Sequence, residues 1–434
     1  MRRLRLLTAG ESHGPEMSGI LEGLPAGLRV STAYVNRDLA RRQHGYGSGR
    51  RMLIEKDQVE WTAGLRFGKT LGSPLAFSIP NLDWENWQER MSVEPVPDGA
   101  RPRPVTLARP GHADLAGAIK YDTRDIRDVL ERASARSTAP RVAAGSVCAQ
   151  LLAVAGVRIW SFVDQLGPVR AFGGVDEPVS LVPDGWATRD RREPTPLRCP
   201  DPEAEERMSA EVDRAIEDGD SIGGSFVVVA EGVPIGLGSN AEWDTRLDSA
   251  LAAAVMGIQA VKGVEIGLGF GAIGRRGSQV HDEVDPDLPS WGRRTNRAGG
   301  IEGGMSNGAT VVVRAAVKPV ATLRKPLDSV DLATGQPGRA HIERSDVAIL
   351  PRAAVVGEAM VALVLADALL TSFGGDTIGD LTAAVRRRRA RSLSARGSGS
   401  SAAATAGGNG TRTLDALPEN AAREAQPVVP GTDA

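Results

Sequence analysis

The feature that most constrains the fold is a long apolar segment near the end of the chain, AAVVGEAMVALVLADALLTSF (353–373). Glu358 and Asp367 interrupt it, and no uncharged apolar run of about 18 residues, the length of a membrane span, occurs in the chain. We therefore predict a helix buried in the protein core and no membrane span. Gly374 and Gly375, which follow directly, predict where this helix ends.

Other segments indicate what surrounds this helix. LDSALAAAVMGIQAVKG (247–263) is apolar on nearly all sides and predicts a second central helix, and a third predicted helix covers 124–137. Runs rich in β-branched residues predict strands within 223–238 and 308–319. Because helices and strands do not alternate as regular βαβ units, the sequence predicts an α+β fold with helices sandwiched by antiparallel sheet.

The length of 434 residues alone suggests two or three domains. Two stretches rich in prolines and charges, 81–107 and 168–207, predict irregular excursions from the fold. From residue 387 the chain is rich in Ser, Gly and Ala and has no aromatic residue. Such a segment buries too little apolar surface to offset its ordering entropy, so we predict a disordered tail over 387–434.

Charge and cysteine usage exclude several classes of protein. The formal net charge of −2 provides no basic field for nucleic acid or an anionic membrane. Two cysteines, Cys148 and Cys199, are too few for a disulfide framework or a multi-thiolate metal site, so we expect no metal. They fit a reducing cytoplasm, and the first residues have no apolar stretch long enough for a signal peptide. We therefore expect a cytoplasmic protein.

Two short motifs match known patterns but fail on their context. GFGAIG (269–274) fits the dinucleotide pattern G-x-G-x-x-G, but the residues that follow include prolines and have no helical period. GMSNG (304–308) fits the nucleophile elbow G-x-S-x-G, but a strand-like run follows it where that motif needs a helix. We predict neither an NAD-dependent oxidoreductase nor a serine hydrolase.

Two histidines lie in loops punctuated by Gly and Pro, His13 in TAGESHGPEMSG (8–19) and His112 in ARPGHADLAGAIKY (108–121). Histidine changes charge near neutral pH, and loops on a rigid scaffold often carry reactive groups. Taken singly, each loop is equally well an ordinary surface turn.

Further loops combine glycine with basic or hydroxyl residues: RRQHGYGSGRR (41–51), NRAGGIEGGMSNG (296–308), KPVAT (318–322) and RSDVAILPRA (344–353). Backbone N–H groups of glycine-rich loops and arginine side chains both bind anions. Together the loops predict a site for a polyanion, with His13, His112 and Asp346 as its acid–base groups.

Eight motifs fall in the order and spacing of the chorismate synthase family: GESHG, RPGHADLAGAIKY, ERASAR, AAVMGIQAVKGVEIG, NRAGGIEGGMSNG, KPVAT, RSDV and FGGD. The resemblance covers residues 1–380, apart from the 168–207 excursion. It implies a β-α-β sandwich assembled as a homotetramer. It also implies one domain over 1–386, rather than two or three.

The resemblance implies an activity as well. That family converts 5-enolpyruvylshikimate 3-phosphate to chorismate and phosphate by an anti-1,4-elimination, the last common step of the shikimate pathway to aromatic amino acids. The reaction requires reduced FMN although it has no net redox change. No reductase domain is visible in the sequence, so we expect an external reductant, with NADPH as a candidate source of reducing equivalents.

Residue by residue, the resemblance gives His13 the protonation of the leaving phosphate and places His112 near the reduced flavin. It makes Asp346 the acid that helps the flavin take the proton from substrate C6. The cofactor contacts that it implies are Arg42, Arg132, Ala133, Ser134, Gln259, Ala260, Gly303, Lys318, Pro319, Val320, Ala321, Thr322 and Arg344.

The sequence departs from the family pattern at two positions. Ser137 stands where many relatives have glutamate, and Ser48 stands at a position that is usually basic, for which Arg50 or Arg51 could substitute. An alternative function is a non-enzymatic relative that binds flavin or an anion. All three acid–base residues are present, and a binding module would not need them, so the sequence favours the lyase.

Overall fold

The computed structural model describes residues 3–47, 56–97, 102–174, 178–192, 194–288, 290–343 and 346–394. Residues 1–393 form one compact unit. The α-helices are α1 (Thr32–Gln43), α2 (Asp114–Tyr121), α3 (Arg127–Ala133), α4 (Ala139–Val154), α5 (Trp186–Arg192), α6 (Pro202–Asp218), α7 (Leu247–Met256), α8 (Leu350–Phe373) and α9 (Ile378–Ser394). The strands are β1 (Arg5–Ala9), β2 (Glu16–Glu22), β3 (Glu60–Ala63), β4 (Leu65–Arg66), β5 (Lys69–Thr70), β6 (Leu75–Pro80), β7 (Arg158–Leu166), β8 (Val169–Arg170), β9 (Gly224–Glu231), β10 (Val261–Ile266), β11 (Ile301–Glu302), β12 (Met305–Ser306), β13 (Val311–Val317), β14 (Asp328–Val330) and β15 (Pro337–Arg339).

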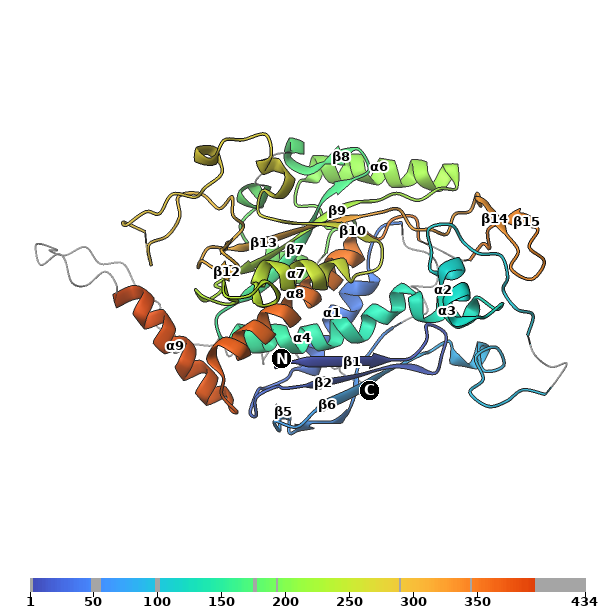
Figure 1. Ribbon diagram of the computed structural model, residues 1–434, viewed down its shortest axis with the longest axis horizontal. Coiled ribbons are helices and arrows are strands. Elements are labelled where there is room, and N and C mark those ends of the chain that lie inside the picture. The colour runs from blue at the N-terminus through green and yellow to red at the C-terminus, as the bar shows by residue number, and fades with distance from the viewer. Residues whose placement is uncertain are drawn as a thin grey trace, which may run out of the picture. The chain divides into compact units, whose positions relative to one another are not determined.

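Two antiparallel sheets enclose a layer of helices (Figure 1). One sheet has the strand order β1-β2-β6-β3, and the other has the order β10-β13-β9-β7-β8. Helices α1, α4, α7 and α8 lie between them. The predicted α+β class, with helices between antiparallel sheets, is confirmed.

Helix α8 is the centre of this layer, as its apolar sequence predicts. It passes the length and composition test for a membrane span, but 78 % of its most apolar stretch is buried inside the protein. Its packing is close: a Cβ added at Gly145 of α4 would lie 2.4 Å from the Cβ of Ala359. A Cβ added at Gly357 would likewise lie 2.4 Å from the ring of Phe226. These glycines allow α8 to approach both α4 and β9, which explains a helix buried on several sides.

The two acidic residues of α8 both have buried partners. Asp367 accepts hydrogen bonds from the backbone N–H groups of Arg3 and Leu4, each at 2.8 Å, and so holds the start of the chain. Glu358 accepts hydrogen bonds from two arginines, Arg41 at 2.9 Å and Arg198 at 3.1 Å. The charges that interrupt the apolar segment therefore attach other parts of the chain to it.

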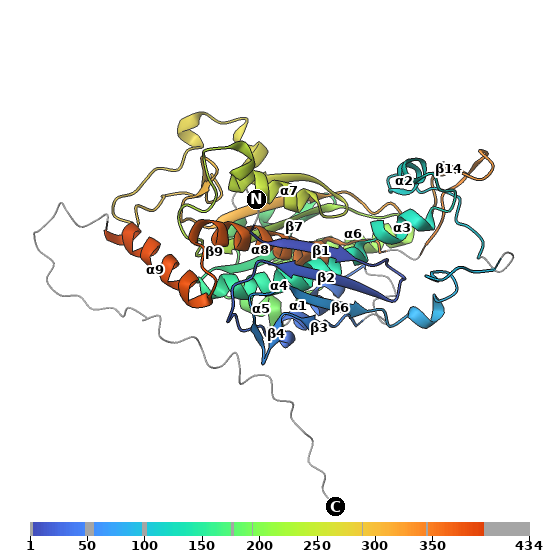
Figure 2. The same cartoon turned by 60° about the horizontal axis from the view of Figure 1, so that its bottom comes forward.

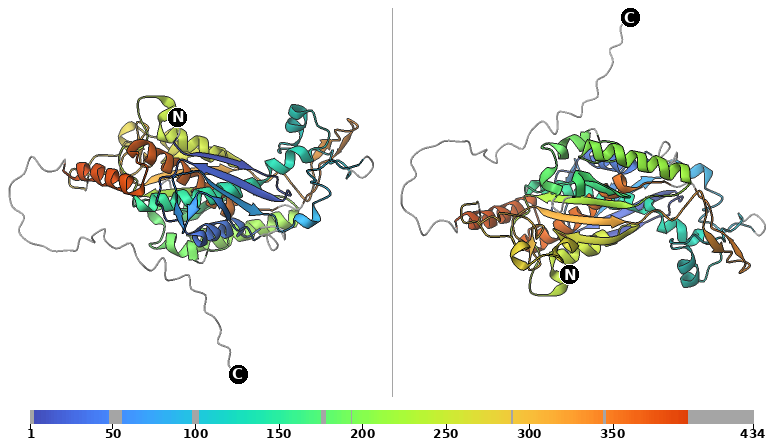
Figure 3. Two further views of the ribbon diagram at one scale, coloured as in Figure 1. Left: turned by 90° about the horizontal axis from the view of Figure 1, so that it is seen from below. Right: turned by 90° about the horizontal axis from the view of Figure 1, so that it is seen from above.

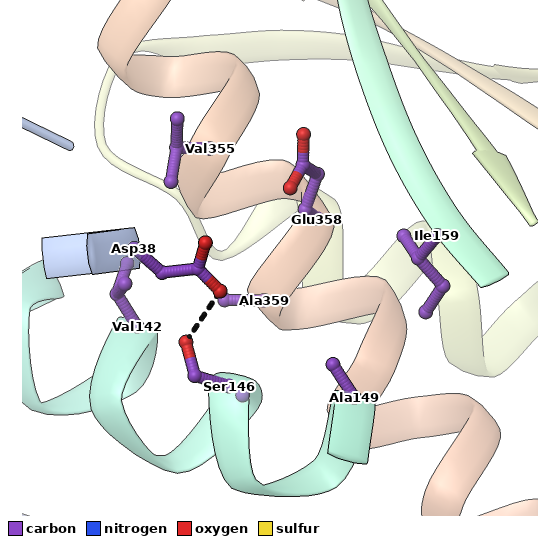
Figure 4. Close-up of a pocket in the computed structure, with 9 residues that line it drawn as sticks. Asp38, Val142, Ser146, Ala149, Ile159, Val355, Glu358 and Ala359 are labelled. Atoms are coloured by element: carbon purple, nitrogen blue, oxygen red, sulfur yellow. Dashed lines mark hydrogen bonds between the residues drawn. The ribbon is translucent and has the colours of Figure 1, made fainter. Parts of the chain in front are cut away.

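A buried ion cluster surrounds Glu358. Asp38 points into the same small cavity between α1, α4 and α8 and accepts a hydrogen bond from Ser146 at 2.9 Å (Figure 4). Burial alone would lower the pKa of Arg41, but the carboxylates of Glu358, Asp38 and Asp190 raise it well above its usual value. Arg41, one of the basic residues of the 41–51 loop, is therefore part of the core and not of the predicted anion site.

Two predicted helices differ from those in the structure. The segment 124–137 is broken at Ser134, whose ψ of 146° is not helical and whose hydroxyl accepts from Arg136 N to begin a short 3-10 helix. The segment 247–263 is helical only to Met256, because Val261 to Ile266 pair with β13 as strand β10. A local side-chain cap therefore ends the first helix, and Gly257 followed by strand pairing ends the second.

The two predicted excursions also contain more structure than expected. The 168–207 segment includes β8 and α5 and enters α6 at Pro202. Trp186 of α5 covers Trp160 and Phe162 on the outer side of the five-stranded sheet. The 81–107 segment has one short 3-10 helix, Trp84–Asn86, in its described part.

The predicted tail boundary at 387 falls inside helix α9, which continues to Ser394. Leu381 and Val385 are buried, and the arginines beyond them hold the fold: Arg389 donates to the carbonyls of Ala155 and Gly232, both at 2.8 Å. The boundary is wrong because composition alone does not reveal that arginines can satisfy loop carbonyls. Residues 395–434 lie outside the described part of the chain.

Both rejected motifs are structural. GFGAIG forms a short 3-10 helix, Gly269–Ala272, in place of the helix that a dinucleotide site needs. Ser306 of GMSNG is buried; it donates to Pro234 O and accepts from Leu237 N, and strand β13 follows. Neither motif carries the function that its pattern suggests.

Helices α2 and α3 and the β14–β15 hairpin gather at one end of the layers, whereas α9 lies at the other (Figures 2 and 3). The turn that carries His112 leads directly into α2, and α3 follows α2 along the chain. The end of the layers that carries α2 and α3 is therefore where the candidate site lies.

Candidate active site

His13 lies in the turn between β1 and β2 and is fixed by α3. Its backbone N–H donates to Glu131 Oε2 at 3.0 Å, and its ring Nδ1 lies 2.7 Å from the same oxygen. The ring packs on Trp87, with 3.7 Å between ring centroids. The exposed fraction of the His13 side chain is 11 %. This histidine is held on several sides, which an ordinary surface turn does not require.

Glu131 is itself held in place by a residue of the same helix. Arg127, one turn earlier on α3, donates to Oε1 at 2.7 Å. The exposed fraction of the Glu131 side chain is 1 %. An i, i+4 pair of this kind forms because α3 places both residues on one face. This pair is visible in the sequence, but the histidine that Glu131 binds lies 118 residues away in the chain.

His112 has a similar arrangement made from local residues. Its Nδ1 contacts Asp114 Oδ1, and Asp114 is also held by Arg109 through Nε at 2.8 Å and Nη2 at 3.1 Å. Burial alone would raise the pKa of Asp114, but the hydrogen bonds from His112 and Arg109 outweigh burial and hold that pKa well below its usual value. The carboxylate stays charged and keeps the histidine turn in place.

Glu343 joins the two histidine arrangements. Its carboxylate lies 3.5 Å from Arg109 Nη1, 3.9 Å from Arg127 Nη2 and 3.5 Å from His341 Nε2. The hydrogen bond from His341 and the charges of the two arginines lower the pKa of Glu343 to about 2, although burial opposes this. A continuous set of charged groups therefore connects His13 with His112, which are far apart in the sequence.

The 318–322 segment lies beside the His112 turn. Lys318 Nζ donates to Gly111 O at 2.7 Å, and Arg109 Nη1 donates to the hydroxyl of Thr322 at 3.2 Å. The backbone N–H of Lys318 donates to Ala260 O at 2.9 Å. Partial burial, and then the nearby Lys262, lower the pKa of Lys318. The structure thus brings KPVAT, PGHAD and the residue Ala260 together, as the resemblance implies.

The predicted flavin residues at the end of α3 lie beside the turn that carries His13. Arg132 donates to the carbonyls of Thr8 and Gly10, both at 2.9 Å, in the strand and turn before His13. Ser134 donates to the hydroxyl of Ser12 at 3.0 Å. Ala133 is the last residue of α3, between these two.

Gln259 offers a site for an N–H donor. Its Nε2 donates to Ser137 Oγ at 2.7 Å, so the serine that departs from the family pattern has a structural partner here. Its Oε1 is buried and has no hydrogen-bond partner among the described residues. A buried acceptor without a donor is costly, and a ligand with an N–H group would relieve that cost. The edge of a flavin ring carries such a group, so this residue fits FMN.

Three predicted site residues have other positions or partners. Gly303 lies in the β11–β12 turn, whose Gly304 accepts from Leu247 N at the start of α7, the opposite end of that helix from Gln259. Asp346 pairs with Arg352 at the start of α8. Arg42 pairs with Asp57 in a buried cluster.

Arg136 connects the Arg42 cluster to the His13 turn. It contacts Asp57 at 3.3 Å and donates to Asn81 Oδ1 at 3.2 Å. Asn81 in turn donates to Gly14 O at 2.8 Å. Arg344, Ser48, Arg50 and Arg51 lie outside the described residues.

The sequence did not identify the residues that bind the two histidines and join them. These are Trp87, Arg109, Asp114, Arg127, Glu131 and Glu343. The pairings around His112 are local, but those of Glu131 with His13 and of Glu343 with Arg109 cross long distances in the chain. Among the described residues no group of three or more His, Cys, Asp or Glu is placed to hold a metal ion.

Comparisons with known proteins identify the family of the chain. The family model described as "Chorismate synthase" matches residues 4–370. A chorismate synthase of Syntrophotalea carbinolica is 53 % identical over 382 residues, which cover 88 % of this chain and 96 % of the relative. One of Symbiobacterium thermophilum is 54 % identical over 381 residues, 86 % of this chain and 96 % of the relative.

A crystal structure of chorismate synthase superposes with a TM-score of 0.72 at 40 % identity and covers 91 % of this chain and 99 % of its own. The fold, the motifs and the full-length relatives agree, and we conclude that the chain belongs to the chorismate synthase family and is an enzyme of the lyase class.

Proposed function

We propose that this enzyme converts 5-enolpyruvylshikimate 3-phosphate to chorismate and phosphate by an anti-1,4-elimination that depends on reduced FMN. The observation that carries the proposal is the connection of His13 and His112 through Arg127, Glu343 and Arg109 at one end of the fold. Family membership supplies the shikimate-pathway lyase step; the residue roles below are argued from this geometry.

His13 is the general acid in this proposal. The phosphate leaves with negative charge, and a proton from the imidazolium neutralises it as the C–O bond breaks. His13 suits this role because Glu131 and Trp87 hold its ring in one orientation. A positioned acid requires no reorganisation at the moment of reaction.

Cationic side chains near the histidines bind the phosphate and the two carboxylates of the substrate. Arg109, Arg127 and Lys318 are the described candidates, and Arg344 is a further candidate from the family resemblance. Several fixed cations are needed because placing two highly charged anions in one pocket otherwise costs repulsion and desolvation.

FMN is held, in this proposal, by Arg132 to Ser134, by Gln259 and Ala260, and by the 318–322 segment. The unpartnered acceptor of Gln259 supports this position. Reduced FMN supplies electron density to the substrate transiently when it is bound. His112 holds or exchanges a proton beside the flavin, and Asp346 assists the removal of the proton from substrate C6.

We also propose the assembly and the setting of the enzyme from its family resemblance. It is a cytoplasmic homotetramer, and an external reductant, with NADPH as the source of electrons, keeps the flavin reduced. Light scattering checks the assembly, and the rate of flavin reduction in the presence of NADPH checks the source of electrons. Neither measurement depends on the elimination reaction.

Anaerobic phosphate release tests the proposal. We expect the purified chain to release phosphate from the enolpyruvyl substrate with reduced FMN, and to release none with oxidised FMN or without flavin. Flavin should remain reduced at the end, because the elimination has no net redox change. Flavin binding without phosphate release would contradict the proposal and support the non-enzymatic relative.

A further inference from the structure

We propose that Glu131 is a positioning residue that keeps a hydrogen on Nδ1 of His13, so that Nε2 is the nitrogen that gives its proton to the leaving group. This inference rests on the proposed function, in which His13 is the general acid. It adds the identity of the reacting atom and of the group that selects it.

The hydrogen bonds of Glu131 determine where the hydrogen lies. Oε1 receives a hydrogen bond from Arg127, and Oε2 receives one from the backbone N–H of His13. Both are N–H donors, so the carboxylate acts as an acceptor at each oxygen. The ring Nδ1 lies 2.7 Å from Oε2, a distance that requires a donor at Nδ1. The neutral ring of His13 is therefore the Nδ1–H tautomer.

The surroundings make this hydrogen bond persistent. The Glu131 side chain is almost completely buried, so water does not compete for its oxygens. The backbone N–H of Ser12 donates to the carbonyl of Glu131 at 3.1 Å, which ties the histidine turn to α3 a second time. Trp87 packs on the ring and prevents it from turning over. Rotation of the ring, which would exchange the two nitrogens, would break both the hydrogen bond to Glu131 and the contact with Trp87.

His112 is bound by Asp114 in a similar way, but its surroundings do not favour one tautomer as clearly. Its Nδ1 contacts Asp114 and also lies 3.1 Å from Arg109 Nη2, which can only donate. Two partners with opposite preferences therefore face the same nitrogen. At His13 the carboxylate is the partner of Nδ1, so the inference is made for that residue.

The first test is E131Q. Glutamine has the size of glutamate but no charge, and its NH2 group meets an N–H donor in either orientation, Arg127 or the backbone N–H of His13. The hydrogen bond that keeps the hydrogen on Nδ1 is therefore weakened or lost. We expect kcat to fall by about 10²-fold or more, the scale for a misplaced general acid, with KM within about threefold. E231Q is the matched control, because Glu231 also accepts from an arginine, Arg158, and from a ring N–H, that of Trp160, at the outer end of β9. E231Q should retain the wild-type kcat.

A double-mutant cycle separates positioning from a structural role. If Glu131 acts through His13, E131Q should lower kcat by less than about threefold in an H13A background. An equal loss in the wild-type and H13A backgrounds would overturn the inference. Wild-type chain that releases no phosphate, or H13A at the wild-type rate, would contradict the proposed function instead, so the two failures are distinguishable.

A measurement on the unmutated chain covers the case in which E131Q does not fold. The chain has five histidines. The chain is labelled with ¹⁵N-histidine and measured by solid-state NMR at alkaline pH, where the ring nitrogen signals show which nitrogen carries the hydrogen. The signals of His13 are those that disappear in H13A. We expect the hydrogen on Nδ1. A hydrogen on Nε2 would overturn the inference whatever the variants show.

Discussion

His13 and His112 each bind, through Nδ1, a carboxylate that an arginine holds in place. Replacing either histidine by alanine should lower turnover by about 10²-fold or more, because a general acid or base is lost. H281A is the control, since His281 lies at an exposed position outside the site. Steady-state phosphate release measures the effect, and FMN titration should give an unchanged dissociation constant. Wild-type rates in both histidine variants would show that these loops are ordinary surface turns without a catalytic role.

Glu343 makes the stability of the fold sensitive to acid. Its pKa is lowered from 4.5 to about 2 in the folded chain, so it contributes stability above about pH 4.5 that is lost as the pH falls towards 2. E343Q lacks this contribution at every pH. We expect urea unfolding to show E343Q less stable than wild type at pH 6, with the difference shrinking between pH 4.5 and 2. A difference that is constant over this range would contradict the assignment.

The sequence indicated candidate acid–base residues but not the residues that hold them. His13 and His112 stand out because they are rare and lie in loops punctuated by glycine and proline. Glu131 looks like an ordinary helical glutamate until the fold places it against a turn 118 residues earlier. Such a pairing has no local signal, because it depends on how α3 packs beside the β1–β2 turn.

At the scale of elements, the buried ion cluster joins α1, α8 and the segment before α6. Arg41 contacts Glu358 at 2.9 Å and Asp190 at 2.8 Å, and its side chain is almost completely buried. R41M should lower the free energy of unfolding by about 3–5 kcal/mol, because it leaves buried carboxylates without their partner. R158M removes a mostly exposed pair with Glu231 and should cost about 0–1 kcal/mol. Similar losses from both substitutions would contradict the burial argument.

Helix α9 sets the end of the folded unit. A chain that ends at 394 should keep wild-type activity and melting temperature, whereas one that ends at 386 loses the contacts of Arg388 and Arg389 with three backbone carbonyls. We expect the shorter chain to melt a few degrees lower. Circular dichroism and phosphate release on both chains measure this. Equal melting temperatures would restore the boundary at 387.

The sequence predicted a helix or strand correctly where the burial pattern and the local propensity indicate the same structure. The apolar segment 353–373 became α8, with its end where two glycines follow. The helix predicted over 247–263 ends at Met256, because Gly257 caps it and a strand that pairs with β13 begins at Val261. Gly257, which caps the helix, is a local stop signal, but it does not reveal that the residues after it form a strand. Strand pairing is a long-range property, and the sequence contains no local record of it.

At the scale of the whole molecule, the absence of regular βαβ alternation predicted the class but not the order of strands. In the five-stranded sheet, β9 lies between β13 and β7, so its neighbours come from both sides of it in the sequence. This order brings the end of β13, with Lys318, to the His112 turn and the Gln259 loop. The cations of the site converge through topology, which periodicity and composition do not reveal.

Lys318 therefore offers a test of whether the assembled site binds FMN. Its Nζ and its backbone N–H hold the His112 turn and Ala260, and Lys262 is close enough to lower its pKa. K318M should raise the FMN dissociation constant by about tenfold at low salt, equivalent to about 1.4 kcal/mol. K262M is the matched control: it removes a neighbouring charge that no predicted flavin contact uses, and it should change the constant by less than about threefold. Because screening weakens the attraction of exposed charges, the gap between K318M and wild type should narrow as salt rises from about 0.05 to 0.5 M. Flavin fluorescence titrations at both salt concentrations decide the matter, and equal dissociation constants for K318M, K262M and wild type would show that the 318–322 segment does not bind the cofactor.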